Sequence, residues 1–274
     1  MPPVLQVERR LRGKVHVWMI AVGQGSVDLS RAASLLDPYE RERARRLSTD
    51  ALRRRYVAAH LGVRRILAGY LSMPPDAISF ARTAGDKPHV VGAELAFNVS
   101  HSGDWAVCAI AERGDIALRT TSSDRRVPRM PGRIGVDIEV IRPVNDADGI
   151  VRRFFARPEA EEYARAAGEA QRAAFFELWT HKEAFVKATG EGLTRPLDSF
   201  AVLGGSNGGP RRLVFESDES PRQWCLRSFV PAPGYAGAIA LDQAVTSIEI
   251  FHWAESSAEA TSESSPSDSV LDCR

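Results

Sequence analysis

Cysteine and long apolar runs are both scarce in this chain. Only three cysteines occur among 274 residues, and the spacing of Cys108, Cys225 and Cys273 fits neither a disulfide framework nor a metal site. Residues 1–8 lack the apolar core of a signal peptide, and no apolar stretch is long enough to cross a bilayer. These absences exclude a disulfide scaffold and predict a reduced, cytoplasmic protein with no membrane partner.

Lysine is the next scarce residue. Of 36 basic residues only four are lysine, and the other 32 are arginine. Two of the four, Lys182 and Lys187, bracket Glu183 on one predicted helix. Lysine is a compact point charge that can sit against a phosphate oxygen, whereas arginine is a wide planar fork. Codon bias alone explains an excess of arginine, so the lysine pair is only a hint of a phosphate site.

The net charge is too small for a nucleic-acid-binding surface. It is formally +1, and residues 254–274 carry five acids and one base, which leaves +5 on the rest of the chain. A modestly basic body suits an anionic ligand or an acidic partner, and we expect no nucleic acid. A hydrophobic share of 44% is enough for one large domain or two small ones.

Apolar patterning predicts helices followed by strands, and this order occurs twice. A first strand is predicted at 15–22, after which Asp37 and Pro38 start a helical region as N-cap and first helical residue. The other predicted elements are helices at 51–71, from 158, and from a break near 168 to a glycine cap at 190, and strands at 95–99, 105–110, 134–140, 200–203, 213–215, 224–229, 237–241 and 248–253.

An arginine-rich stretch separates the two groups of elements. Residues 113–133 hold six arginines with little apolar periodicity, which predicts a long loop. We therefore divide the chain into an N-terminal lobe (1–118), an arginine-rich linking loop (119–132), a C-terminal lobe (133–253) and a disordered tail (254–274).

Two acids share one face of the predicted strand at 134–140. Asp137 and Glu139 alternate with apolar residues, so they point the same way and are separated by about 6.5 Å of backbone. Carboxylates this close repel each other unless a cation lies between them, and hard oxygen ligands favour Mg²⁺ or Mn²⁺ over Zn²⁺. The alternative is the exposed face of an edge strand.

A third acid lies on the predicted helix that ends near residue 190. Lys182, Glu183 and Lys187 span an arc of roughly 140°, with the acid in the middle. Trp179 and Val186 lie on the same side, which indicates that Glu183 faces the interior, where a carboxylate needs a partner. The alternative is a surface glutamate paired with Lys187 at i+4.

The stretch Ser100-His101-Ser102-Gly103 is the third polar segment. At a predicted turn, residues 100–104, it offers hydroxyls, an imidazole and free backbone N–H groups, which suit a phosphate. The alternative is ordinary turn chemistry with a bystander histidine.

Taken in order, these segments resemble a known set of motifs. Residues 97–103, 135–139 and 179–187 are similar to the three signature blocks of the 4'-phosphopantetheinyl transferases, and most similar to those of the surfactin-synthetase-activating (Sfp) type. Residues 85–88 and 190–200 agree with this family as well. The resemblance implies an enzyme that moves the phosphopantetheine arm of coenzyme A onto a serine of an apo acyl or peptidyl carrier protein and releases adenosine 3',5'-bisphosphate.

The resemblance also implies a fold and a location for the site. It extends roughly over residues 37–253 and implies an α+β fold of two similar lobes related by a pseudo-twofold axis. Each lobe would pack helices on a small, mainly antiparallel sheet, with the ligand cleft between the lobes. A chain with an internal cleft needs no second subunit, so we expect a monomer.

By resemblance, the three acids and the two lysines form the reaction centre. Asp137, Glu139 and Glu183 would hold Mg²⁺, or Mn²⁺, on the pyrophosphate of coenzyme A. Glu183 would be catalytic as the base for the serine hydroxyl, with a water on the metal as the alternative base. Lys187 would be catalytic, and both Lys182 and Lys187 would contact the pyrophosphate.

Further residues would bind the adenosine end of coenzyme A. His101, with Ser100 beside it, would contact the 3'-phosphate. Arg43 and Arg55 stand where the family has cationic ligands of that phosphate, although Glu40 stands where some members carry another base. The residues implied near the adenine are Lys87 and Pro88.

Two other functions use the same residues. A metal-dependent hydrolase of a nucleotide or coenzyme A pyrophosphate would employ these acids and lysines with water as the nucleophile. A non-catalytic module that binds carriers or coenzyme A would need no base.

Overall fold

The computed structural model describes most of the chain. The described residues are 11, 13–23, 32, 34–112, 133–204, 211–215, 224–242, 247–253 and 270–272. The predicted linking loop at 119–132 lies outside them. No helix in this part of the chain is both long and apolar enough to span a bilayer.

In the first half, the described residues form two α-helices and five strands. Strand β1 (Lys14–Ala21) comes first and is followed by α2 (Pro38–Arg45), α3 (Asp50–Leu71), the 3₁₀ turn Pro75–Ala77, β2 (Phe80–Arg82), β3 (Pro88–Val90), β4 (Leu95–Ser102) and β5 (Trp105–Glu112).

The described residues of the second half follow the same general order, from a strand through helices to further strands. It consists of β6 (Ile134–Val140), α4 (Ala147–Phe154), α5 (Arg157–Ala164), α6 (Gly168–Thr189), the 3₁₀ turns Gly192–Thr194 and Leu197–Ser199, β7 (Phe200–Leu203), β8 (Arg212–Phe215), β9 (Cys225–Phe229) and β10 (Tyr235–Leu241). Two strands follow, β11 (Ser247–Trp253) and β12 (Val270–Asp272). The sequence patterns missed α4 and the short strands β2, β3 and β12.

The two main sheets have matching strand orders. The larger is β12-β11-β1-β5-β4, and the smaller is β6-β10-β9. In the larger sheet β1 pairs antiparallel with β5, and β5 pairs antiparallel with β4. In the smaller sheet β6 pairs antiparallel with β10, and β10 pairs antiparallel with β9. The predicted α+β class, with helices on small and mainly antiparallel sheets, is therefore confirmed, while the pseudo-twofold axis stays a prediction.

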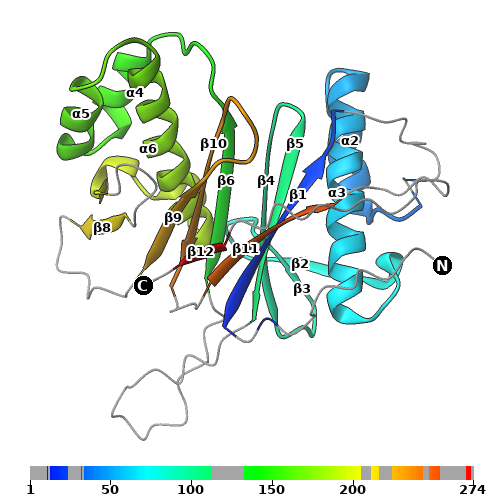
Figure 1. Cartoon of the computed structure of the whole chain (residues 1–274). Helices are drawn as coiled ribbons and strands as arrows, with labels where there is room; N and C mark the ends of the chain where they lie inside the picture. The colour runs from blue at the N-terminus through cyan, green and yellow to red at the C-terminus, as the bar shows by residue number, and fades with distance from the viewer. Residues whose placement is uncertain are drawn as a thin grey trace, which may run out of the picture.

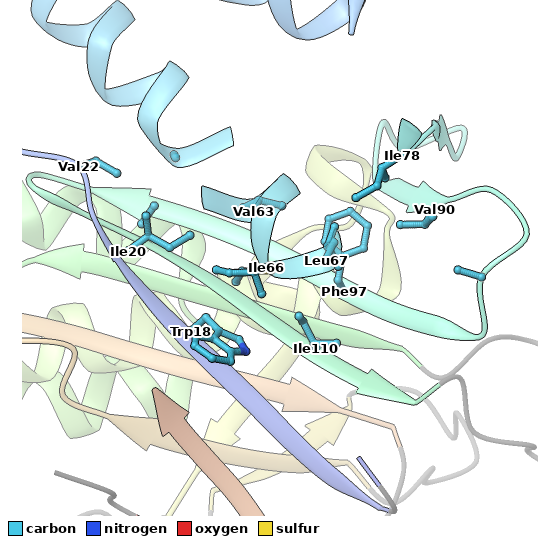
Figure 2. Close-up of a cluster of buried hydrophobic side chains, with 14 of the residues drawn as sticks. Trp18, Ile20, Val22, Val63, Ile66, Leu67, Ile78, Val90, Phe97 and Ile110 are labelled. Atoms are coloured by element: carbon cyan, nitrogen blue, oxygen red, sulfur yellow. The ribbon is translucent and has the colours of Figure 1, made fainter. Parts of the chain in front are cut away.

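The sheets stand face to face with one long helix on each outer side (Figure 1). Trp18, Ile66, Leu67, Phe97 and Ile110 fill the space between α3 and the larger sheet (Figure 2). A second apolar cluster joins the two sheets, with Val17, Met19, Val136, Ile138 and Ile239 among its members. A third packs α6 on the smaller sheet. The two lobes therefore share a continuous interior.

The C-terminal strands correct the predicted lobe boundary. Residues 247–253 were assigned to the C-terminal lobe, but β11 pairs parallel with β1 and so belongs to the N-terminal sheet. This happens because the edge of β1 opposite β5 offers unpaired backbone groups, which a further strand satisfies. Disorder is predicted for 254–274, whereas 270–272 form β12 against β11; residues 254–269 lie outside the described part.

One buried ion pair occurs in each half, between a short helix and a long one. Glu40, in the first turn of α2, has Oε2 2.7 Å from an Nη of Arg64 on α3. Glu159, in the first turn of α5, has Oε2 2.7 Å from Nζ of Lys182 on α6. The side chains of all four residues are at most 3% exposed.

Each buried base then ties its long helix to the turn that follows. Arg64 donates to the carbonyls of Pro75 and Ile78, and Lys182 donates to those of Leu197 and Phe200, all at 2.7–3.1 Å. Glu40 therefore has a structural role, as the partner of Arg64, and does not point toward a phosphate.

Candidate active site

The site lies along the seam where β4 and β6, one from each half, run side by side (Figure 1). The two strands are not paired in one ladder. Instead, alternate side chains of β4 accept hydrogen bonds from the backbone N–H groups of β6. These bonds run from Val136 to Asn98 Oδ1 (2.9 Å), from Ile138 to Ser100 Oγ (3.3 Å) and from Val140 to Ser102 Oγ (3.1 Å).

The polar segment predicted as a turn is mostly strand. Residues 100–102 end β4 and pair with β5, so the hairpin turn is only Gly103 and Asp104. Gly103 has φ of +56°, and a Cβ there would lie 2.5 Å from the Tyr235 hydroxyl, so glycine is required. The serine hydroxyls are consequently held on a rigid strand.

The β6 acids receive the hydroxyl protons of these serines. Ser100 Oγ donates to Asp137 Oδ1 at 2.8 Å, and Ser102 Oγ donates to Glu139 Oε2 at 2.7 Å. The ammonium of Lys187 lies 2.6 Å from the same Asp137 oxygen and donates to Ser100 Oγ at 3.0 Å. Although β6 is an edge strand of its sheet, the face that carries these acids is not exposed, because Asp137 is buried and Glu139 is half-buried, so the exposed-face alternative is wrong.

A glycine lets α6 approach β6 closely enough to bring in the third acid. A Cβ on Gly135 would lie 1.9 Å from the carbonyl oxygen of Ala184, so a larger residue would push the helix away. Glu183 precedes that alanine and faces the β6 acids. Burial raises the pKa of Glu183, and the nearby carboxylates of Asp137 and Glu139 raise it further, while Lys187 opposes them.

Glu139 also interacts electrostatically with Asp137. Burial also raises the pKa of Glu139; the Ser102 hydrogen bond and Lys187 oppose this effect, and the Asp137 carboxylate adds to it. The three acids named from the sequence are therefore brought together by the fold, and their negative charges repel one another. The arrangement calls for a cation.

The donor set fits a hard divalent cation. Asp137 Oδ2 is buried and has no hydrogen-bond partner, so a ligand-capable oxygen is free. All the acidic oxygens here are hard donors, as Mg²⁺ and Mn²⁺ prefer. Among the described residues no three acidic, histidine or cysteine side chains are already arranged as a metal site. Lys187 is the cation that contacts Asp137 in this structure.

Two adjoining cavities open on either side of Glu183 and Lys187. The smaller, about 320 Å³, is also lined by Ser100, His101, Asp137, Glu139 and Trp179. The larger, about 490 Å³, extends toward the β2–β3 turn, the end of α4 and the turns after α6. Its walls include Lys87, Pro88, Arg153, Phe154, Arg195 and Asp198. Together they form one groove with the acids near its middle.

Lys87 lines the larger cavity with its stem, but its ammonium points away from the groove. The Nζ donates to the carbonyls of Ile134 (2.7 Å) and Ala188 (3.0 Å), which ties the β2–β3 turn to the C-terminal half. Burial lowers the pKa of Lys87 from 10.5 to about 8. Pro88 also lines this cavity.

The Lys87 shift predicts how stability changes in alkaline solution. Between about pH 8 and 10.5 the unfolded chain binds more protons than the folded one at Lys87, so the free energy of unfolding rises with pH. The size of the rise is about 1–3 kcal/mol. Lys87→Met should lack this component. Urea unfolding across the window checks it, and equal pH slopes for the two proteins would contradict it.

Lys182 is not at the groove, which corrects its predicted contact with the pyrophosphate. Its ammonium is fully buried and donates to Glu159, Leu197 and Phe200. All three N–H donors are thus in use. The physical reason is that neighbours on a helix are about 100° apart, so Lys182 enters the core when Glu183 faces the groove.

The residues predicted for the 3'-phosphate are only partly brought together. His101 lines the smaller cavity, and its pKa is lowered by partial burial and then by Lys187 and His60. Arg55 is partly exposed, with an Nη 2.6 Å from an Asp104 oxygen. Arg43 is exposed on α2. Neither arginine lines the two cavities.

Sequence patterns missed the wall formed by α4. Arg153 and Phe154 line the larger cavity, and a helix there was not predicted. The signal was present as an apolar stripe at Ile150, Val151 and Phe154, which has helical spacing. The hydrogen bond from Ser102 to Glu139 was also missed, because it depends on two strands meeting from different lobes.

Comparison with known proteins agrees with this geometry. Residues 25–113 match the family model described as 4'-phosphopantetheinyl transferase, N-terminal, and residues 133–240 match the 4'-phosphopantetheinyl transferase superfamily. The two matched stretches fall on either side of the 113–133 stretch. They contain α3 with β4 and β6 with α6, the elements that form the seam.

Relatives of similar length were found in two bacteria. The chain is 30% identical over 245 residues to the 4'-phosphopantetheinyl transferase HetI of Nostoc sp., covering 88% of this chain and 91% of that protein. It is 28% identical over 210 residues to the 4'-phosphopantetheinyl transferase Sfp of Bacillus subtilis, covering 76% and 83%.

A solved structure overlaps part of the fold. A holo-(acyl-carrier-protein) synthase from Bacillus anthracis, in complex with CoA (3',5'-ADP), is 19% identical over 40% of this chain and 93% of that chain, with a TM-score of 0.34. The family assignment comes instead from the two family models and from HetI, whose match extends over most of both chains. The resemblance seen in the sequence is confirmed, and the chain belongs to the 4'-phosphopantetheinyl transferase superfamily.

Proposed function

We propose that this protein transfers the 4'-phosphopantetheine arm of coenzyme A to a serine of an apo acyl or peptidyl carrier protein and releases adenosine 3',5'-bisphosphate. One observation carries the proposal. Three acids from β6 and α6 line a groove together with Lys187. The groove lies between two halves of a chain that belongs to this family. Such a centre suits a substrate that carries a pyrophosphate.

Asp137, Glu139 and Glu183 would hold Mg²⁺, or Mn²⁺, and the buried free oxygen of Asp137 supports this assignment. When bound, the ion would neutralise negative charge on the pyrophosphate. Lys187 would add a positive charge on the same side, since its ammonium already lies 2.6 Å from Asp137.

Glu183 is the proposed base. Burial and two neighbouring carboxylates raise its pKa as long as no metal is bound, and a bound Mg²⁺ would lower that pKa again, so a water on the metal stays the alternative base. It would take the proton of the carrier serine. The serine oxygen would form a bond to the phosphorus that bears the pantetheine arm, and the bond from that phosphorus to the bridging oxygen would break. Adenosine 3',5'-bisphosphate would leave with the bridging oxygen.

Coenzyme A would lie along the groove. The adenine would rest on Pro88 and the stem of Lys87, and the 3'-phosphate would contact His101 and Ser100 in the smaller cavity. Arg43 and Arg55 remain proposed outer ligands of this phosphate, and Arg55 would have to leave Asp104 to reach it. Lys182 is not included.

The test is to incubate the protein, Mg²⁺ and coenzyme A with several apo carrier domains and to measure their masses. A phosphopantetheine increment on the carrier serine is the expected result. Nucleotide release should require the carrier. Release without a carrier would show a pyrophosphate hydrolase instead, and binding without either product would show a non-catalytic module.

We also propose that the protein acts as a monomer in the cytoplasm. The groove is formed within one chain. Cys108 is a buried thiol whose pKa is raised by burial, which suits a reduced compartment. Sedimentation of the full chain would check the monomer.

A further inference from the structure

The seam between β4 and β6 repeats one arrangement twice. In each repeat a serine of β4 accepts a backbone N–H of β6 and donates its own proton to the carboxylate one residue earlier on β6. The two sets are Ile138, Ser100 and Asp137, then Val140, Ser102 and Glu139.

This arrangement fixes the direction of the hydroxyl proton. A serine hydroxyl has one proton and two lone pairs. At Ser102 the N–H of Val140 approaches a lone pair at 3.1 Å, and the Glu139 oxygen lies 2.7 Å away as the acceptor. The N–H and the carboxylate therefore hold the hydroxyl between them, and its proton points to Glu139.

Asp137 and Glu139 differ in the number of side-chain hydrogen bonds that they accept. Asp137 accepts hydrogen bonds from both Ser100 and Lys187. Glu139 accepts a side-chain hydrogen bond from Ser102 and from no other described residue. Its side chain also has one more rotatable bond than aspartate, so it depends more on this contact for its orientation.

Ser102 is itself anchored from the other lobe. The next two residues form the hairpin turn, in which Gly103 packs against the Tyr235 hydroxyl and the N–H of Asp104 donates to that hydroxyl at 3.1 Å. Tyr235 belongs to β10, the strand that pairs with β6. The hairpin turn, Ser102 and Glu139 are thus fixed relative to one another, because Tyr235 connects the turn to the sheet that contains β6.

We propose that Ser102 is a positioning residue that holds the Glu139 carboxylate toward Asp137 and Glu183, so that the three acids can bind a divalent cation together. The inference rests on the proposed function, which includes the divalent cation. It gives a role to Ser102, for which the family resemblance implied none. Ser102 acts through Glu139 and touches neither substrate nor reacting atoms.

The test measures Mn²⁺ binding by calorimetry or electron paramagnetic resonance, with and without coenzyme A, in the full chain. Ser102→Ala should weaken Mn²⁺ affinity by about 10- to 100-fold, and Ser102→Thr, which keeps the hydroxyl, should restore most of it. The Mg²⁺ concentration needed for half-maximal transfer should shift in the same order, with a smaller change in the rate at saturating Mg²⁺.

Asn98→Ala is the matched control for the seam. Asn98 accepts the N–H of Val136 in the same way but donates to neither acid of β6 in the described structure. Its loss should lower thermal stability as Ser102→Ala does, yet leave the Mn²⁺ affinity measured without coenzyme A unchanged; the comparison is made without coenzyme A because Asn98 also lines the larger cavity. Equal weakening in both variants would overturn the proposal, because the lobe contact alone would then explain the effect.

A double variant tests whether Ser102 affects Mn²⁺ affinity through Glu139. In a Glu139→Gln background, Ser102→Ala should cause little further loss of Mn²⁺ affinity, since the two residues act through one carboxylate. Independent, additive losses would overturn the inference, as would a wild-type chain that binds no Mn²⁺ even with coenzyme A. A chain that binds Mn²⁺ in this pattern but modifies no carrier would refute the proposed function alone.

Discussion

Glu183→Gln should lower the rate of phosphopantetheine transfer by at least about a thousandfold while coenzyme A still binds. A general base contributes about 10²- to 10⁴-fold, and this side chain is also a proposed ligand of the metal. Glutamine has the same shape but accepts no proton. Single-turnover transfer, followed by carrier mass, measures the rate, and calorimetry measures coenzyme A binding.

The matched control for this variant is Glu161→Gln. Glu161 is exposed on α5 and, among the described residues, pairs with Arg157 one turn earlier, so its removal should leave transfer and stability nearly unchanged. If Glu183→Gln retained more than a tenth of the wild-type rate, Glu183 would not be the base. If the transfer rate of Glu183→Gln equalled that of the wild type in every buffer tested, the acid cluster would not be the reaction centre.

Residue spacing within a single helix or strand was enough to predict those parts of the site that lie on one element. The alternation along β6 was enough to put Asp137 and Glu139 on one face, because side chains alternate along any strand. Asp37 and Gly190 were likewise predicted as helix ends, and the structure shows a capping box at the first and φ of +73° at the second.

Contacts between distant segments could not be predicted in this way. Lys182 and Glu183 are neighbours, and periodicity placed both within one arc without deciding which of them enters the core. The decision comes from Glu159, which is far away in sequence and needs a buried cation. Likewise, no local signal shows that β11 joins β1 or that Ser102 meets Glu139.

The buried pair in each half suggests why one lysine of the motif is structural. Arg64 in α3 and Lys182 in α6 have equivalent partners: an acid of the preceding short helix and two carbonyls of the following turn. The N-terminal half contains the pair although the three proposed metal-binding acids come from β6 and α6 of the other half. The pair therefore belongs to the framework of both lobes, and Glu183 and Lys187 are the residues by which α6 differs in function.

Lys182→Met should destabilise the protein by about 3–5 kcal/mol, because it leaves the Glu159 carboxylate buried without its cation. Burial raises the pKa of Glu159 and lowers that of Lys182, and their mutual attraction opposes both shifts. Losing one partner removes that compensation. Urea unfolding measures the loss, and Glu159→Gln combined with Lys182→Met should recover part of it.

Lys187→Met makes the same chemical change five residues later in the same helix and should have the opposite profile. Its side chain is 29% exposed at the groove, so stability should fall by less than in Lys182→Met, while transfer falls sharply. Conversely, Lys182→Met should bind coenzyme A normally at a temperature where it stays folded. A stable Lys182→Met variant with weakened coenzyme A binding would instead make Lys182 a ligand of the pyrophosphate, as the family resemblance implied, and would require its ammonium to leave Glu159 when substrate binds.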